Sequence, residues 1–306
     1  MPSAKITRRY LLLSILIFII AFFIIFSTIS YLGSIYTSYL AQFLIILTMA
    51  IVSSLILAFT LGYFTTTVSS AMILLRGRMR MDSLSNPLLV RLSTEAPGTY
   101  YHSLNVSSIA QRAARAIGAD SLTVRTAAYY HDIGKLSAPD DFIENIYRSK
   151  VNDDRSATQL RKKVKLIISH VPEGVKIAEE NHLSQEMIDF IREHHGKSKV
   201  ISLYKEAKER GFRIDQKDFT YPGPTPRSRE SAILMLADCV EAAARARSPL
   251  TKRSIREIVD SAAKEKLESG ELKSSGLTSS QLLKINKSLA ESLLAVFHHR
   301  VAYDQD

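Results

Sequence analysis

The stretch Tyr129-Tyr130-His131-Asp132-Ile133-Gly134-Lys135 decides how this 306-residue sequence is interpreted. It closes an apolar run, residues 122–130, that predicts a helix. An imidazole and a carboxylate side by side at the end of a buried helix are costly unless something pairs with both groups. A metal ion does so, because neutral imidazole and ionised carboxylate are both metal ligands. The His-Asp pair therefore predicts a metal site, provided that other parts of the chain supply further ligands.

Further ligands are available at the ends of other predicted helices. The chain has 8 histidines, and most of them fall at or near such ends. Asp238 lies in the apolar stretch 235–240, where a carboxylate needs a partner. One histidine on a helix is more often an ordinary core or surface residue, so the hypothesis depends on how many there are and how they are paired. The candidate metal ligands are His102, His131, Asp132, His170, His194, His195 and Asp238.

From residue 96 onward the sequence predicts an all-α bundle. Helical periods follow one another with short polar breaks and without strand alternation. Residues 96–99 (Ala-Pro-Gly-Thr) predict a turn, and the proline-rich residues 221–226 predict a loop. His170 falls between the third and the fourth predicted helix. The predicted helices cover residues 100–117, 121–130, 158–169, 172–181, 184–195, 200–210, 228–247, 252–269 and 278–299.

The N-terminal quarter of the chain has the composition of a membrane anchor. Residues 10–75 contain no Asp, Glu, Lys, Arg or His, and about 20 apolar residues suffice to cross a bilayer. Glycine, serine and tyrosine in residues 31–39 predict a loop between two membrane helices, about 10–30 and 40–64. A buried helical hairpin of a soluble domain, or a cleaved signal peptide, fits this length less well. The lipid bilayer is therefore an expected partner.

Charged flanks predict the orientation of this anchor. Basic residues precede the first span and follow the second, and the connecting loop has no charge. By the positive-inside rule, a multi-pass protein of the plasma membrane with both termini in the cytoplasm is expected. We divide the chain into an anchor (1–75), a juxtamembrane connector (76–95) and a cytoplasmic domain (96–306). The flanking basic residues are Lys5, Arg8, Arg9, Arg76, Arg78 and Arg80.

Composition limits the remaining possibilities. The only cysteine, Cys239, excludes an intrachain disulfide and a cysteine-rich zinc site. The formal net charge of +10 suits contact with anionic lipid head groups or attraction of a polyanionic small molecule, and an ordinary basic surface explains it as well. Polymeric nucleic acid is not an expected partner. The oligomeric state stays open, a homodimer included.

The order of the candidate ligands, with His131-Asp132-Ile133-Gly134 at its centre, resembles the HD-domain (HDIG) metal-dependent phosphohydrolases. The similarity is greatest to the membrane-anchored cyclic di-AMP phosphodiesterases of the PgpH type. It covers about residues 90–303. Further matching motifs are residues 96–100, 142–145, 193–196, 221–224 and 235–238.

This resemblance implies a two-metal site that holds iron or manganese. One ion would be held by His102, His131, Asp132 and Asp238. The other would be held by His170, His194 and His195, with Asp132 as the bridging ligand. It implies that a hydroxide bridging the metals opens cyclic di-AMP to linear pApA. The expected catalytic residues are His131, Asp132 and Lys135.

Five residues are candidates for contact with the substrate. Lys135, three positions after Asp132, is placed to neutralise a phosphate oxygen, or is a solvated lysine. Arg227 and Arg229 flank the start of a helix, where an anion would be favoured, or are surface arginines. Tyr221 and Phe142 are candidates for stacking on adenine, and core packing is an equal alternative.

The sequence departs from the family pattern in three places. Tyr101-His102 stands where relatives have two histidines, and residues 150–155 replace a usual Asn-Pro-His-Asp stretch. Relatives also have more membrane helices and a large external domain, so the chain could derive from a longer ancestor. Two alternatives therefore stay open. One is hydrolysis of another nucleotide, cyclic di-GMP or a mononucleotide, and the other is a non-catalytic nucleotide-binding membrane scaffold.

Overall fold

Every named element of regular structure is a helix in the part of the chain that the computed structural model describes, residues 20–21, 23–35, 38–145 and 156–297. Strand-like pairing there is limited to one isolated bridge between Lys199 and Thr220. The expected all-α fold is thus confirmed for these residues. The chain divides into two units, residues 1–78 and 79–306. The basic N-terminal flank, residues 10–19 of the first expected span and the altered stretch 150–155 lie outside the described residues.

The first unit contains an apolar helix, Phe23–Ile35, and most of α2 (Tyr39–Asp82). Within α2, Tyr39–Met72 is predominantly apolar, and none of its most apolar 18-residue stretch is buried. By length and composition, this is the one helix among the described residues that is both long enough and apolar enough to cross a membrane. The predicted loop at 31–39 is too long, because residues 31–35 are helical.

Residues 65–82 continue α2, so the helix extends into the predicted connector. Hydroxyl groups in the polar run Thr65–Ser70 bond to backbone carbonyls of the same helix. Thr66 and Thr67 donate hydrogen bonds of 2.9 and 2.8 Å to the Tyr63 carbonyl, and Ser70 donates one of 2.8 Å to the Thr66 carbonyl. These bonds satisfy the side chains within the helix itself.

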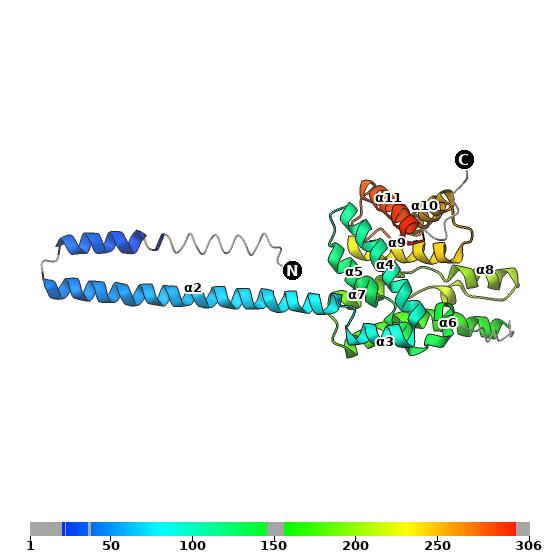
Figure 1. Ribbon diagram of the computed structural model, residues 1–306, viewed down its shortest axis with the longest axis horizontal. Helices are drawn as coiled ribbons and strands as arrows, with labels where there is room; N and C mark the ends of the chain where they lie inside the picture. Colours follow the sequence, from blue (N-terminus) through cyan, green and yellow to red (C-terminus); the bar gives the residue numbers. More distant parts are fainter. Residues whose placement is uncertain (1–19, 22, 36–37, 146–155, 298–306) are drawn as a thin grey trace. The chain divides into compact units, whose positions relative to one another are not determined.

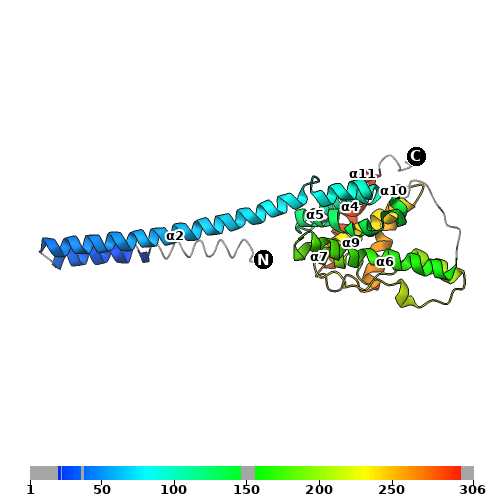
Figure 2. The ribbon, with the colours of Figure 1, turned by 90° about the horizontal axis from the view of Figure 1, so that it is seen from below.

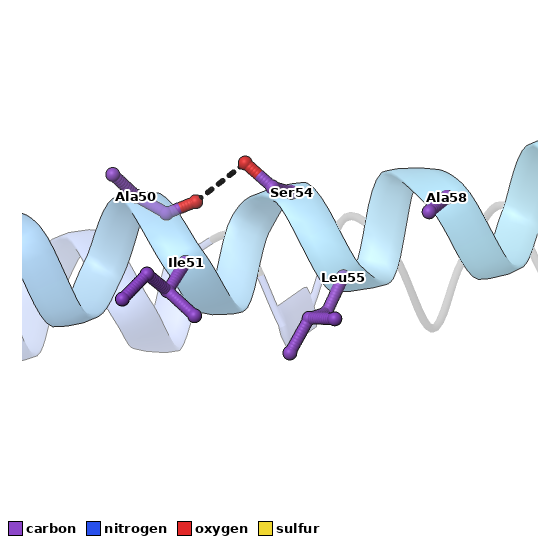
Figure 3. A pocket seen from close by; sticks show the side chains of 5 residues that line it. All are labelled: Ala50, Ile51, Ser54, Leu55 and Ala58. Carbon is purple, nitrogen blue, oxygen red and sulfur yellow. Dashed lines mark hydrogen bonds between the residues drawn. The ribbon is translucent and has the colours of Figure 1, made fainter.

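A shallow depression on α2 is lined by small side chains (Figure 3). Ala50, Ser54 and Ala58 are spaced four residues apart, and Ile51 and Leu55 complete the lining. The Ser54 hydroxyl donates a 2.7 Å hydrogen bond to the Ala50 carbonyl, so its polar atom is satisfied. Such spacing of small residues is typical of apolar helices that pack closely in membranes. No titratable group lines this depression.

The second unit holds the remaining helices (Figure 1). Asn86 caps α3, and prolines begin α3 and α4, where their fixed φ suits a first helical turn. Among the described residues of this unit, four short 3-10 helices lie between the longer elements. The elements are α3 (Pro87–Glu95), α4 (Pro97–Ala116), α5 (Ser121–Tyr130), η1 (Ile133–Ser137), η2 (Pro139–Asp141), η3 (Ile143–Asn145), α6 (Ala157–Glu180), α7 (Gln185–Glu193), α8 (Ile201–Glu209), η4 (Gln216–Phe219), α9 (Arg229–Ala246), α10 (Lys252–Glu268) and α11 (Ser279–Val296).

Three apolar clusters hold this unit together. The largest joins α4, α5, α9, α10 and α11, and α4 contacts α5, α9 and α11 (Figures 1 and 2). A second joins α3, η1, α6 and α7, with Ile133 and Ile191 fully buried in it. A third, around Phe219, joins the first half of α6 to α8 and η4. The candidate ligands come from α4, α6, α9 and the turns after α5 and α7, which the first two clusters hold together.

Two further predicted boundaries are wrong. Residues 97–99, which were expected to form part of a turn, are the first residues of α4. Residues 157–180 form a single helix, α6, with Pro172 inside it, whereas two helices separated near His170 were expected. A proline inside a helix removes one backbone hydrogen bond and normally bends or breaks the helix. Here buried residues on both sides of the proline, Val164 and Ile177 among them, pack against neighbouring helices. His170 therefore projects from the middle of α6.

Candidate metal centre

The His-Asp pair lies at the C-terminal end of α5. Asp120 accepts a 3.1 Å hydrogen bond from the Thr123 amide and so begins the helix, and His131 is the residue at its C-terminal cap. Asp132 precedes η1. The exposed fractions are 0% for His131 and 2% for Asp132. Burial of both polar side chains was expected, and the structure confirms it.

Gly134 explains how α6 reaches this pair. A methyl group at Gly134 would overlap the His170 carbonyl oxygen and the Gly174 amide nitrogen of α6. The absence of side chains at both glycines lets the turn and the helix touch through their backbones. His170 Nε2 consequently lies 3.3 Å from Asp132 Oδ1.

The histidine rings are aimed by hydrogen bonds from Nδ1. In His131, His170 and His194, Nδ1 lies 2.8, 2.5 and 2.7 Å from the backbone carbonyl three residues earlier in the chain. In His102, Nδ1 lies 2.6 Å from Glu241 Oε2. Nδ1 is then the protonated nitrogen, so Nε2 of each ring is the nitrogen that can act as a metal ligand.

The ligand atoms gather in two groups. His102, His131 and Asp238 form one, and His170, His194 and His195 form the other, with the ligand atoms of each group all within 4.8 Å of one another. Asp132 lies between the groups. Its Oδ2 is 3.6 Å from His102 Nε2 and 3.3 Å from His131 Nε2. Its Oδ1 is 3.3 Å from His170 Nε2 and 3.8 Å from His194 Nε2.

All seven predicted ligands therefore meet in one place. Asp238 adds a second link between the groups, because its Oδ1 is 3.0 Å from His102 Nε2 and its Oδ2 is 3.7 Å from His195 Nδ1. Two buried atoms, His131 Nε2 and Asp132 Oδ1, have no hydrogen-bond partner. An unpaired buried nitrogen and carboxylate oxygen are costly. Divalent cations between the two groups would satisfy them, so the residues fit a pair of metal ions.

The electrostatics of the centre favour ionised carboxylates. Burial alone would raise the pKa of Asp132, but Lys135 and His131 hold it well below its usual value. Burial opposes protonation of His131, yet the Asp132 and Asp238 carboxylates outweigh burial and raise its pKa to about 10. Burial, with His131 and His170 nearby, lowers the pKa of His194 to about 3. A cation would take the place of the His131 proton beside those carboxylates.

Lys135 lies within the centre rather than in solvent. Its Nζ is 2.8 Å from Asp132 Oδ2 and 2.5 Å from Glu144 Oε1. Burial would lower the pKa of Lys135, but these two carboxylates raise it above its usual value. The Thr99 hydroxyl donates a 3.4 Å hydrogen bond to Glu144 Oε1, which ties α4 to the same pair.

Tyr221 and Phe142, the two aromatic residues predicted to contact the substrate, lie next to the group of His170, His194 and His195. The Tyr221 ring lies 4.2 Å from the His195 ring at 31°, and the Phe142 ring lies 6.2 Å from the His170 ring at 89°. Both aromatic side chains are buried. In this structure they pack on ligand histidines, and a role in stacking on a base stays a prediction.

The two predicted arginines lie at the start of α9. Arg227 is exposed, and its Nε is 2.6 Å from Glu193 Oε1. The same carboxylate accepts a 3.1 Å hydrogen bond from the Arg227 amide. An anion was expected near the start of this helix. In the structure the Glu193 carboxylate, next to His194 in the chain, is the anion that contacts Arg227. Arg229 is the first residue of α9 and is half-buried, and substrate contact by either arginine stays a prediction.

Sequence reasoning missed the roles of four carboxylates that bind residues in or next to the centre. Glu193 holds Arg227, Glu144 holds Lys135, and Glu241 holds His102. The fourth, Glu271, accepts hydrogen bonds of 3.0 and 3.1 Å from the Lys197 amide, just after the His194-His195 turn. The role of Glu241 could have been suspected from sequence. It lies one turn after Asp238 in an alanine-rich helix, where a buried acidic residue needs a partner.

Comparison with known proteins agrees with this geometry. The HD domain family profile matches residues 99–243. Cyclic-di-AMP phosphodiesterase PgpH of Bacillus subtilis (strain 168) is 39% identical over 230 residues, which are 74% of this chain and 32% of that protein. The chain thus spans about a third of the length of the curated relatives it matches, a PgpH of Listeria monocytogenes included.

Solved structures match over most of the second unit. The crystal structure of the L. monocytogenes PgpH HD domain is 36% identical, with a TM-score of 0.65, and the match covers 70% of this chain and 100% of that domain. The same domain in complex with cyclic-di-AMP is 35% identical, with a TM-score of 0.66, and the match covers 70% and 99%. Together with the convergence of the His and Asp residues around Asp132, these matches show that the chain belongs to the HD-domain family, in the group that contains the HD domains of PgpH.

Proposed function

We propose that this chain is a metal-dependent phosphodiesterase that hydrolyses cyclic di-AMP to linear pApA. Two divalent cations, iron or manganese, would be held by the seven clustered ligands. His102, His131, Asp132 and Asp238 hold the first, and His170, His194 and His195 hold the second together with Asp132. The mixed imidazole and carboxylate ligands, without thiolate, suit these metals.

The position of Asp132 carries this proposal. One carboxylate oxygen faces the His102 group and the other faces the His170 group, at 3.3 to 3.8 Å from four imidazole nitrogens. A carboxylate placed between two ligand groups would fit a two-metal site of the kind that hydrolyses phosphate esters. When bound, the two cations supply activation of water and neutralisation of phosphate charge.

The other residues of the centre bind and orient. Lys135, fixed between Asp132 and Glu144, presents an ammonium group beside the cation site and so favours a phosphate oxygen there. The hydrogen bonds from Nδ1 keep the ligand histidines in one orientation. The Tyr221 ring lies beside His195 and the Phe142 ring lies beside His170, and we assign these two rings to stacking on a purine.

The substrate choice rests on the relatives. The matching B. subtilis and L. monocytogenes proteins are cyclic-di-AMP phosphodiesterases, and one matching structure is a complex with cyclic-di-AMP. The region that the HD domain profile matches, residues 99–243, includes all seven clustered ligands. We therefore assign cyclic di-AMP to this chain, with cyclic di-GMP as the alternative that a substrate panel must separate.

Activity is tested on the full chain in detergent micelles. Protein prepared anaerobically with Mn²⁺ or Fe²⁺ is incubated with cyclic di-AMP, cyclic di-GMP and a mononucleotide, and products are separated by chromatography. We expect pApA, and no turnover after removal of metal with a chelator. Turnover of cyclic di-GMP alone would change the assigned substrate to cyclic di-GMP. Fewer than one bound metal ion per chain would favour a nucleotide-binding scaffold. Light scattering of the same preparation decides between a monomer and a homodimer.

We also propose a plasma-membrane location with two spans and both termini in the cytoplasm. The support is the apolar helix Tyr39–Met72 of α2, the shorter apolar helix Phe23–Ile35 before it, and the basic residues on both flanks. In a Cys239→Ser background, Ser34→Cys is expected to react with a membrane-impermeant maleimide in intact cells. Ser3→Cys is expected to react only after lysis. The opposite labelling pattern would contradict the proposed orientation and place both termini outside the cytoplasm.

A further inference from the structure

Glu241 is a buried carboxylate that is not itself among the candidate metal ligands. It lies on α9 one turn after Asp238, and its exposed fraction is 0%. Its Oε2 is 2.6 Å from His102 Nδ1, the ring nitrogen that faces away from the cation site. Glu241 is thus connected to the centre through a ligand histidine.

The environment of Glu241 keeps a charged carboxylate in place. Asn105 on α4 donates a 3.3 Å hydrogen bond to Oε1, and Arg245 Nε on α9 lies 3.6 Å from Oε2. A buried carboxylate is tolerated when cationic and hydrogen-bonding partners surround it. Both oxygens of Glu241 are engaged, and its orientation toward His102 is fixed.

This arrangement distinguishes the two ligand groups. Among the described contacts of the other ligands, Nδ1 of His131, His170 and His194 bonds to backbone carbonyls. Those carbonyls are neutral, whereas Glu241 brings a negative charge behind His102. The His102 group also contains Asp238, while the His170 group consists of three histidines. Among the ligands and the side chains that hydrogen-bond to them, the carboxylates other than the shared Asp132 are therefore Asp238 and Glu241, and both contact His102.

We propose that Glu241 is a positioning residue that makes the His102 site the tighter of the two cation sites, so that this site fills first. The inference rests on the proposed two-metal centre. A carboxylate behind a ligand histidine fixes the ring and makes its other nitrogen a stronger donor. It also adds Coulombic attraction for a dication in a region of low dielectric. Loss of such a partner typically weakens metal affinity about 10- to 100-fold.

The test is a metal titration of the full chain in detergent after chelator treatment. Co²⁺ is added, its visible absorption is followed, and bound metal is counted by elemental analysis. The wild type is expected to show one tighter and one weaker site. His102→Gln should remove the tighter site, and His194→Gln should remove the weaker one.

In this titration Glu241→Ala should weaken the tighter site about 10- to 100-fold and leave the weaker site unchanged. Glu241→Gln keeps an acceptor for the His102 N–H without the charge, and should restore part of the affinity. The matched control is Glu206→Gln on α8, which also has an arginine four residues later but forms its ion pair with that arginine alone among the described contacts. It should bind both ions as the wild type does.

Unchanged affinity of the tighter site in Glu241→Ala would overturn the inference, and so would selective weakening of the other site. If Glu241→Ala does not fold, as judged by circular dichroism, Glu241→Gln decides, and wild-type affinity in it overturns the inference. Failure of the wild type to bind two ions would contradict the proposed function instead, so the two failures are distinguishable.

Discussion

Asp132 Oδ1 and His170 Nε2 lie 3.3 Å apart, although one residue follows α5 and the other lies in the middle of α6. The other carboxylate oxygen of Asp132 is 3.6 Å from His102 Nε2. Asp132 is therefore shared by both ligand groups, whereas each histidine belongs to one. Substitution of Asp132 and of a single histidine should have different consequences.

Asp132→Ala should abolish hydrolysis and reduce bound metal at both sites, because both lose a carboxylate ligand. Insertion into the membrane should be unchanged, since residue 132 lies outside the apolar segments. Activity and metal content of the detergent-purified chain, together with its recovery from the membrane fraction, provide the measurement. Retained turnover would refute the bridging assignment.

His170→Asn should lose about one metal ion per chain and keep the other, because the His102 group is intact. The control is His182→Asn. His182 is exposed, and its φ of 54° is a conformation that asparagine tolerates well. Elemental analysis should give two ions for His182→Asn and one for His170→Asn. Loss of both ions in His170→Asn would show that the sites fill only together.

Gly134→Ala should destabilise the chain, because the added methyl group would overlap the backbone of α6 at His170 and Gly174. Overpacking of this kind costs about 1–3 kcal/mol. Gly62→Ala on α2 is the matched control, since nothing lies within 4 Å of a methyl group there. Thermal unfolding followed by circular dichroism should show a lower midpoint for Gly134→Ala alone. Equal midpoints would mean that α6 can move away at little cost.

Glu144→Gln should lower stability at neutral pH by about 1–3 kcal/mol, because Lys135 loses a buried charged partner. Burial would raise the pKa of Glu144, but Lys135 outweighs it and holds this pKa below its usual value. The contribution of the carboxylate is therefore complete above about pH 4.3, its unfolded value, and is lost as the pH falls through the lower folded value. Urea unfolding of metal-free protein should show a difference between variant and wild type that shrinks in acid. A difference independent of pH would argue against the ion pair.

The ligand set was predictable from sequence because each member carries a chemical signal of its own. His131 and Asp132 are adjacent polar residues after an apolar run, and Asp238 interrupts another apolar run. Their helices were also predictable, since α5 and α9 follow clear apolar periods and begin at capping residues. The boundary at Pro172 was not predictable from local preference, because packing on both sides of the proline keeps α6 continuous.

The supporting carboxylates could not be assigned from sequence, since their roles depend on contacts between distant segments. Glu241 meets His102 across 139 residues of sequence, and Glu271 meets Lys197 across 74. The close approach of Gly134 to α6 is equally a tertiary effect, because nothing in the local sequence says which backbone will touch the glycine.

The hydrogen bonds from Nδ1 to the carbonyl three residues earlier have a consequence for exchange of the ions. His131, His170 and His194 are each oriented by the helical turn on which they stand. Unwinding of one turn at the end of α5 or α7 would release both the carbonyl and the ring, so a ligand would be freed without any wider opening of the bundle. The rate at which each ion leaves should then follow the fraying rate of its own helix end, and hydrogen exchange of the amides in those turns would report it.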